Sequence, residues 1–457
     1  MSLQIKRSRL LRQVGLATLS MALITHGAAH GQDVEALEAR IEALEAMLAE
    51  LRDEVTAARD SQAAQTDRVI EIERQVASAP ASAPVLAPAA RSGDGFQVGN
   101  TIFKMAGFVD IDYHVTDVSD GDIAPTSIAR DFYIPGATPV GGTGDDSPDT
   151  DFTAKGSRIA FTSETPTPSG TPLTGRVELD FLGSPGGDER VSNSYNPRLR
   201  LAWINYGGWR VGQDWTTFQN TSAIPESASF LVASDGMIFV RQMLVRYTHG
   251  NWQFALENPD TTVTPYGGGG RIDAGDGAMP DLVARYNHTG SFGNVSLAAL
   301  VRNLAYENGG VDGNATAWGL SASGKIKIGD DSDVRFSLSG GEGIGRYIGL
   351  NAVNGAVVTA SGDLEAIPVW GGLIALRQSV GEGRRINVGY SHLEADNDIT
   401  LTGTGATKRV YSAFGNYMVT VQPGLTVGGE VLFGERELEN GQSGTLTRFT
   451  VSTKYAF

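Results

Sequence analysis

From Phe96 to the end of the chain, apolar and polar residues alternate in stretches of about ten, which is the length of a tilted strand that crosses a membrane. Clusters of Gly, Pro, Asn and Asp separate the stretches. An alternation with period two indicates β-strands with one apolar and one polar face. We expect roughly sixteen strands, a number typical of large barrels. They start near residues 102, 153, 172, 197, 208, 237, 251, 279, 291, 313, 332, 364, 383, 406, 424 and 443.

The connections between the expected strands alternate in length. The long segments are 116–152, 184–196, 214–236, 259–278, 304–312, 349–362 and 396–405. The short turns contain Gly207-Gly208, His249-Gly250, Thr289-Gly290, Val380-Gly381 and Gln422-Pro423-Gly424. Outer-membrane barrels have short periplasmic turns and long outer loops, whereas a soluble β-sandwich has no reason to keep this alternation. The pattern therefore predicts an all-β transmembrane barrel of about 16 antiparallel strands over residues 96–457.

The last expected strand separates its two faces clearly. Phe449, Val451, Tyr455 and Phe457 share one parity, and the residues between them, such as Arg448, are mostly polar or charged. One face therefore suits lipid and the other suits water. A C-terminal Phe that closes such a strand resembles the signal that outer-membrane proteins present to the barrel-assembly machinery.

A different period governs residues 32–76. Apolar residues recur there at alternating spacings of three and four, which indicates an α-helical parallel coiled coil. Gln62 and Gln65 would fix its register. The β-branched a positions with Leu at d favour two strands, so the heptads alone do not prove a trimer, and an isolated amphipathic helix is the alternative. The expected oligomerisation seam includes Leu37, Ile41, Leu44, Leu48, Leu51, Gln62, Gln65 and Ile72.

The remaining N-terminal segments complete the predicted domain order. Residues 1–31 combine a basic start, an apolar stretch and a small-residue exit, which is typical of a signal peptide cleaved after Ala29 or Gly31. A membrane anchor, the alternative, needs a longer apolar run. Residues 77–95 are rich in Pro, Ala and Ser and read as a linker. We expect the barrel in the outer membrane of a Gram-negative bacterium and the coiled coil in the periplasm.

Composition excludes several classes of function. The chain has no Cys, which removes disulfides, thiolate nucleophiles and Cys-ligated metals. Its net charge of −16 argues against a nucleic-acid partner. The histidines His114, His249, His288 and His392 are widely separated, and no Gly-x-Ser-x-Gly motif occurs. We therefore expect no catalytic function and no cofactor.

A weak metal motif lies in the first long segment. Asp145, Asp146, Asp149 and Asp151 follow the glycine-rich residues 141–144, and carboxylates are calcium ligands. One copy of Gly-Gly-x-Gly-x-Asp is not a repeat. Outer-loop acids more often stay solvated or bridge lipopolysaccharide, so a structural Ca²⁺ is only the minor alternative.

Strand parity assigns many arginines to the lumen. In the segment Arg198-Leu199-Arg200-Leu201, the leucines are expected to face lipid and the arginines to face inward. An arginine that faces lipid at the midplane would cost about 2–4 kcal/mol. The same argument applies to Arg158, Arg176, Arg210, Arg285, Arg302 and Arg335. Arg241 and Arg246 have opposite parity, so one regular strand cannot point both of them inward.

Guanidinium groups in a narrow pore bind carboxylates and phosphates, and rings of them select anions. Small organic anions are therefore the favoured solutes. The alternative is that the arginines pair with lumenal acids such as Glu178 and Asp180 and only stiffen the wall.

The long segment 214–236 is the candidate constriction loop. It is only mildly polar, and Trp215, Phe218 and Phe230 could anchor it against the wall. In many porins the third outer loop folds into the barrel and narrows it. An ordinary surface loop is the alternative, although its apolar content would suit water poorly.

Three stretches carry a resemblance to a known family: SRIAFTSETPTPSGTPLTGRVELDF, PRLRLAWINYGGWRVGQDWTTF and FVRQMLVRYTHGNWQFALENP. Together they resemble the DcaP-type family of trimeric outer-membrane porins, with a continuous match from about Phe96 to Pro259. The resemblance implies a homotrimer of sixteen-stranded barrels, embedded in lipid and lipopolysaccharide, that passes small anions such as dicarboxylates. The arginines that it implies at the constriction are Arg158, Arg198, Arg200, Arg241 and Arg246.

A second function stays open. The coiled coil could tether the outer membrane to peptidoglycan or to periplasmic partners, and the barrel would then serve chiefly as an anchor.

Overall fold

The structure is a computed structural model that describes residues 95–142, 147–183, 187–188, 192–308 and 311–457. The chain divides into two compact units, Met1–Ala87 and Pro88–Phe457, and the described residues belong to the second. The predicted signal peptide, the coiled coil with its seam from Leu37 to Ile72, and the linker up to residue 94 lie outside the described residues. Those assignments stay predictions.

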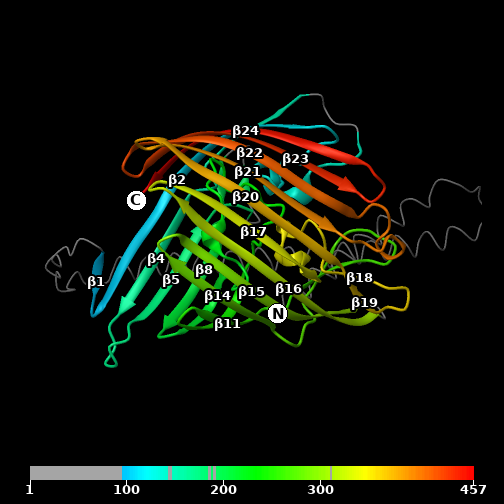
Figure 1. Cartoon of the computed structure of the whole chain (residues 1–457), viewed down its shortest axis with the longest axis horizontal. Coiled ribbons are helices and arrows are strands. Elements are labelled where there is room, and N and C mark those ends of the chain that lie inside the picture. Colours follow the sequence, from blue (N-terminus) through cyan, green and yellow to red (C-terminus); the bar gives the residue numbers. More distant parts are fainter. Residues whose placement is uncertain (1–94, 143–146, 184–186, 189–191, 309–310) are drawn as a thin grey trace, which may run out of the picture. The chain divides into compact units, whose positions relative to one another are not determined.

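Within the described residues, sixteen antiparallel strands close into a β-barrel (Figure 1). Closure is made between the first and last strands, from Phe108 opposite Ala456 to Val118 opposite Leu446. The predicted barrel is thus confirmed. In order around the wall the strands are β2 (Thr101–Val118), β4 (Arg158–Thr165), β5 (Leu173–Asp180), β8 (Arg198–Tyr206), β9 (Trp209–Trp215), β10 (Arg241–His249), β11 (Trp252–Glu257), β14 (Asp281–Gly290), β15 (Gly293–Asn308), β16 (Val311–Ile328), β17 (Ser332–Glu342), β20 (Pro368–Gly381), β21 (Arg384–Ala395), β22 (Thr407–Gln422), β23 (Leu425–Leu438) and β24 (Ser443–Ala456).

The strand expected near residue 153 is in two pieces. β3 (Asp149–Thr153) pairs with the second half of β2, and β4 pairs with the first half. The break lies between the pairs Asp112–Thr153 and Phe108–Arg158. A further strand, β1 (Phe96–Val98), pairs with the start of β2 as a short hairpin.

The outer wall is apolar, as expected of a surface that faces lipid. In β24, Phe449, Val451 and Tyr455 are exposed on the outside, while Arg448 and Thr450 are buried inside, which confirms the predicted parity. Exposed aromatic side chains form two bands, one near each end of the strands, as in the aromatic girdles of outer-membrane barrels. Near the short turns these are Tyr206, Trp209, Tyr247, Trp252, Phe292, Tyr417, Tyr455 and Phe457, and near the long loops they are Tyr113, Phe152, Trp318, Trp370 and Phe433.

We call the barrel end with the short turns the turn end, and the opposite end the loop end. One expected loop is wrong: residues 304–308 and 311–312 continue β15 and β16, which pair as far as Asn308–Val311. The reason is burial, because Leu304 is fully covered by a small sheet of loop strands. That sheet consists of β12 (Thr261–Thr264), β13 (Ile272–Ala274), β18 (Ala356–Val358) and β19 (Leu364–Ala366).

The apolar core lies inside the barrel, between the wall and loops that fold inward. One cluster joins Phe218, Tyr347 and Ile348 of two loops to wall residues such as Leu300 and Val369. A second cluster joins the loops after β2 and β9 to another part of the wall, with members such as Phe132, Leu231, Leu373 and Phe414. Three loops therefore fill much of the lumen.

The remaining elements are short. Among the described residues, no helix is long and apolar enough to cross a membrane. The short elements are η1 (Ile128–Arg130), η2 (Pro135–Ala137), β6 (Gly187–Asp188), β7 (Ser194–Tyr195), η3 (Thr221–Ala223), η4 (Gly345–Tyr347), η5 (Gly349–Asn351) and α3 (Ile399–Thr402).

Gly236 shows how closely the loop after β9 approaches the wall. A Cβ atom there would lie 2.2 Å from the nitrogen and 2.3 Å from the oxygen of Gly372 in β20. We predict that Gly236→Ala pushes the loop off the wall and costs about 1–3 kcal/mol of unfolding free energy, as overpacking does. The measurement is the heat-dependent loss of the folded band in detergent. Gly270→Ala, whose Cβ would meet nothing within 4 Å, is the control, and equal stability of the two variants would contradict the close approach.

Candidate pore constriction

The segment between β9 and β10, residues 216–240, folds into the lumen, and we call it the constriction loop. Its first limb starts at the loop end, where the Thr216 hydroxyl and the Thr217 N–H donate to the Glu257 carboxylate, each at 2.6 Å. Further down, Asn220 Nδ2 donates to Asn294 Oδ1 at 2.8 Å. Asn294 is the second residue of β15, so this limb reaches the turn end.

The second limb runs back towards the loop end along the opposite wall. The N–H of Ala228 donates to the Glu430 carboxylate at 2.9 Å. Closer to the loop end, the Asp235 carboxylate accepts hydrogen bonds from Ser412 of the wall and from Tyr133 of the loop after β2, the latter at 2.8 Å. Gly236 N donates to Ser391 Oγ at 2.8 Å. Carboxylates, amides and hydroxyls thus hold the loop at several points along both limbs.

Each of the three predicted anchors has an aromatic partner in a loop. Phe218 is 1 % exposed, and its ring centre lies 6.0 Å from that of Tyr347. The ring centre of Phe230 lies 4.8 Å from that of Phe132, with the two rings tilted by 52°. Trp215 meets Phe239 at 4.8 Å. Their part in narrowing the path of a solute stays a prediction.

Glu178 of β5 gathers three of the predicted arginines in the lumen. Its carboxylate lies 2.7 Å from Arg176, 2.8 Å from Arg200 and 3.5 Å from Arg158. Parity brings them together, because Arg158 and Arg176 point inward from β4 and β5 beside Glu178, and Arg200 does so from β8.

Asp180, two residues further along β5, binds the arginines of the same cluster that lie closer to the loop end. Arg198 donates to both of its oxygens at 2.8 Å, a bidentate pair, and Arg200 donates to it at 2.6 Å. Four arginines therefore surround the two carboxylates of Glu178 and Asp180.

The arginines differ in whether a solute could reach them. The side chains of Arg158, Arg176 and Arg198 keep 23 %, 30 % and 22 % of their surface exposed, but Arg200 keeps 2 %. Arg200 is covered by Phe230, whose ring centre lies 5.4 Å from its guanidinium carbon. Arg200 therefore holds Glu178 and Asp180 in place and is covered from the lumen.

The prediction that Leu201 faces lipid is wrong. Leu199 is 46 % exposed on the outer wall, whereas Leu201 is 7 % exposed. A β-bulge between Glu178 and Leu179 lets Arg200 occupy an extra position in β8, which shifts the parity of the strand by one.

Arg246 and Arg241 lie at different levels. Arg246 points inward and donates to Asp214 at 3.0 Å and to Thr217 of the constriction loop at 2.8 Å. Arg241, the first residue of β10, lines a cavity of about 540 Å³ at the loop end. Its Nη1 atom has no hydrogen-bond partner among the described residues.

Two further predicted residues lie closer to the turn end than the arginines around Glu178 and Asp180. Arg210 stacks at 4.0 Å on the ring of Trp203 and pairs with Asp214 at 2.8 Å. Arg285 donates to the carbonyl of Gln219, so it helps to hold the constriction loop down.

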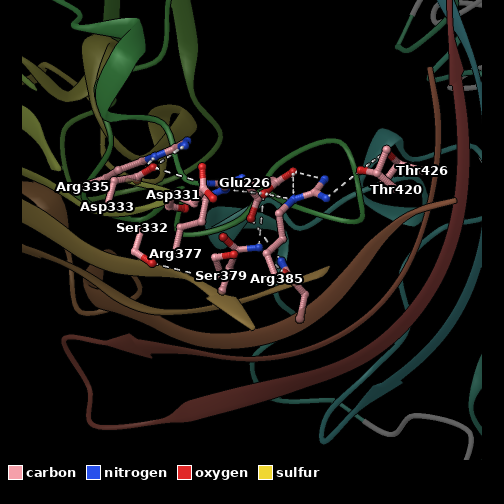
Figure 2. Close-up of polar contacts among 12 residues, drawn as sticks. Glu226, Asp331, Ser332, Asp333, Arg335, Arg377, Ser379, Arg385, Thr420 and Thr426 are labelled. Atoms are coloured by element: carbon pink, nitrogen blue, oxygen red, sulfur yellow. Dashed lines mark hydrogen bonds and ion pairs between the residues drawn. The ribbon is translucent and has the colours of Figure 1, made fainter. Parts of the chain in front are cut away.

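The structure also shows inward-facing arginines that were not predicted from the sequence. Arg377 of β20 and Arg385 of β21 lie at the turn end and meet Glu226, at the lowest part of the constriction loop (Figure 2). Parity could have found Arg385, because Ile386 and Val388 beside it face outward. No local pattern shows its contact with Glu226, 159 residues away in the chain.

Burial alone would raise the pKa of Glu226. The hydrogen bonds and the positive charges of Arg385 and Arg377 outweigh it and hold the pKa below the ordinary value of 4.5. Glu226 is therefore ionised at neutral pH.

The weak calcium motif is only partly described. Asp145 and Asp146 lie outside the described residues. Asp149 and Asp151 both pair with Arg130, at 2.5 and 2.9 Å. Among the described residues, no group of three or more His, Asp or Glu is placed to hold a metal.

Comparison with known proteins agrees with the barrel fold. Residues 100–457 match the family described as DcaP outer membrane protein. The fold is similar to the crystal structure of the outer membrane channel DcaP of Acinetobacter baumannii, with a TM-score of 0.66 and 21 % identity over 80 % of this chain and 100 % of that chain. An anion-selective porin from Comamonas acidovorans has a TM-score of 0.48 and 11 % identity, over 78 % and 100 % of the two chains. No curated protein matches the sequence.

The buried, hydrogen-bonded carboxyl of Asp235 predicts that the stability of the protein depends on pH. Burial raises the pKa of this carboxyl from 3.8 to about 6, although Ser412 and Tyr133 donate to it. Because the folded pKa is the raised one, protonation stabilises the folded loop. The contribution is complete below pH 3.8 and is lost as the pH rises through about 6.

We predict that the wild-type barrel loses on the order of 3 kcal/mol of unfolding free energy between about pH 4 and about pH 7 that Asp235→Asn keeps. Thermal unfolding in detergent across that range is the measurement. Parallel pH profiles for the two proteins would show that Asp235 does not titrate in this way.

Proposed function

This chain belongs to the family of DcaP outer membrane proteins, and on that premise we propose that it is a porin for passive diffusion of small hydrophilic solutes, with a preference for small organic anions such as dicarboxylates. The observation that carries the proposal is the cluster on β4, β5 and β8. There, four guanidinium groups face two carboxylates, which leaves an excess of positive charge beside the constriction loop.

The exposed arginines suit transient binding of a carboxylate. A guanidinium presents N–H donors in a planar fork that matches the two oxygens of a carboxylate. Arg158, Arg176 and Arg198 already share their acids, so a solute carboxylate would complete their hydrogen bonding without stripping the wall of its partners. Conduction needs binding that is favourable but weak and spread over several sites. Neighbouring arginines on adjacent strands provide such a series.

The net charge of −16 does not oppose this proposal, because selectivity follows the local field at the narrow part of a pore. The inward loops strengthen that field. They replace water in the lumen with protein, which lowers the local dielectric constant around the charges that remain exposed.

The proposal includes the assembly. We expect a homotrimer that sits in lipid and lipopolysaccharide and that the barrel-assembly machinery inserts. Phe457 lies at the seam of the barrel, since its N–H and C=O pair with Gly107 at 3.0 Å, and the residue is 49 % exposed. The C-terminal residue thus takes part in closing the barrel.

Substitution of two exposed arginines tests the proposal. We predict that Arg158→Gln and Arg176→Gln each raise the succinate concentration that half-blocks the channel about fivefold, the effect of losing about 1 kcal/mol of ion pairing. Each should also shift the reversal potential in a KCl gradient towards cations. Single-channel recording in a planar bilayer measures both.

Arg384→Gln is the matched control, because Arg384 is exposed at the start of β21 and has the parity of the outer wall. It should leave block and selectivity unchanged. A wild-type channel that prefers cations and is not blocked by succinate would refute the anion preference and leave the barrel standing. Absence of any conductance from folded protein would instead favour the anchoring function.

A further inference from the structure

Glu226 of the constriction loop sits between two guanidinium groups at the turn end of the lumen. Arg385 binds it in a bidentate manner, with Nη2 to Oε1 at 2.6 Å and Nε to Oε2 at 2.8 Å. Arg377 Nε donates to Oε2 at 3.2 Å, and Asn387 Nδ2 approaches the same oxygen at 3.4 Å. Figure 2 shows the two arginines reaching the carboxylate from neighbouring strands.

The wall at this place is positively charged without Glu226. Lys325, Arg335, Arg377 and Arg385 face inward there. Two wall acids lie near this group. Asp333 is 2.7 Å from Arg335, 3.9 Å from Arg377 and 4.0 Å from Lys325, and Glu430 of β23 binds Ser227 and Ala228 of the loop. The exposed turns beside this group carry both signs. The carboxylate of Glu226, which belongs to the constriction loop, therefore neutralises part of the excess positive charge of the wall.

Water reaches this site. The side chains of Glu226, Arg377 and Arg385 keep 25 %, 29 % and 12 % of their surface exposed. The site is also separate from the cluster at Glu178 and Asp180, because β20 and β21 lie on another part of the barrel wall.

Two other contacts hold the constriction loop on either side of Glu226. On one side of it, the Ile224 carbonyl accepts from Arg335, and on the other side the Ala228 N–H donates to Glu430 at 2.9 Å. The Glu226 side chain can therefore leave the two arginines while the loop backbone stays on the wall.

The geometry that Glu226 adopts is the one that a free carboxylate would adopt on the same two arginines. We propose that Arg377 and Arg385 form a second carboxylate-binding site, at the turn end of the lumen, and that Glu226 occupies it as a tethered competitor which a passing carboxylate displaces. The proposal rests on the proposed function, since it needs a carboxylate solute in the lumen. Because the competitor is attached to the chain, its effective concentration is high, which keeps solute binding weak and release fast.

Neutralising the competitor tests the proposal. Glu226→Gln should lower the concentration of succinate that half-blocks the channel about fivefold and lengthen the blocked events. Adding Arg385→Gln should abolish this gain, whereas adding Arg384→Gln, one residue away on the outer parity, should keep it. Glu430→Gln is the control for a loosened loop, because it weakens another anchor of the same limb without freeing an arginine. Gel mobility before and after heating verifies that each variant is folded.

Three results would overturn the proposal. Block by succinate could be the same in Glu226→Gln as in the wild type. Glu430→Gln could produce the same gain, so that loosening of the loop is the cause. The gain could also survive the loss of Arg385. In all three cases, an intact effect of Arg158→Gln on wild-type block would leave the proposed function standing, whereas loss of block in the wild type itself would remove both.

Discussion

The constraint on which this structure depends is that a backbone in lipid must satisfy its own hydrogen bonds. A sheet can meet it only by closing on itself, and here closure brings β24 back to β2 and the terminal Phe457 to Gly107. Closure also turns the alternation along each strand into an inside and an outside. The outer positions carry the apolar side chains that suit lipid, and the inner positions carry charged and polar residues from every part of the chain.

A barrel of sixteen strands encloses more space than its own side chains fill. This chain fills much of it with loops, whose apolar residues form two clusters against the wall. The polar parts of the constriction loop are held by buried carboxylates, among which Glu257 and Glu430 bind backbone N–H groups. A carboxylate in such a position needs several donors to offset its burial, so each one fixes a short piece of loop. The outline of the remaining lumen follows from where these carboxylates lie.

The inner arginines divide according to the same packing. Arg200 and Arg246 are nearly covered. The hydrogen bonds of Arg200 join two wall strands, and those of Arg246 join the wall to Thr217 of the constriction loop. Arg158, Arg176 and Arg198 have comparable partners but stay partly open to water. Whether an arginine supports the structure or faces the lumen therefore depends on which loop residue lies over it. The interpretation of these arginines as wall supports and their interpretation as solute contacts are compatible, because different members of one cluster have different cover.

The sequence by itself determined the strands, their faces and the positions of nearly all turns, because the direction of a side chain in a strand depends only on its place in a local alternation. It also carried the family resemblance and the inward direction of most arginines. It could not show the bulge at Arg200, which reverses the parity for Leu201, or that β15 and β16 extend through residues 304–308 and 311–312 beneath the loop sheet. Only the tertiary structure decided that Arg200 is covered while Arg158 is open, and that Glu226 meets Arg385. These contacts join residues that are far apart in the chain, and their geometry depends on how the loops fill the closed barrel.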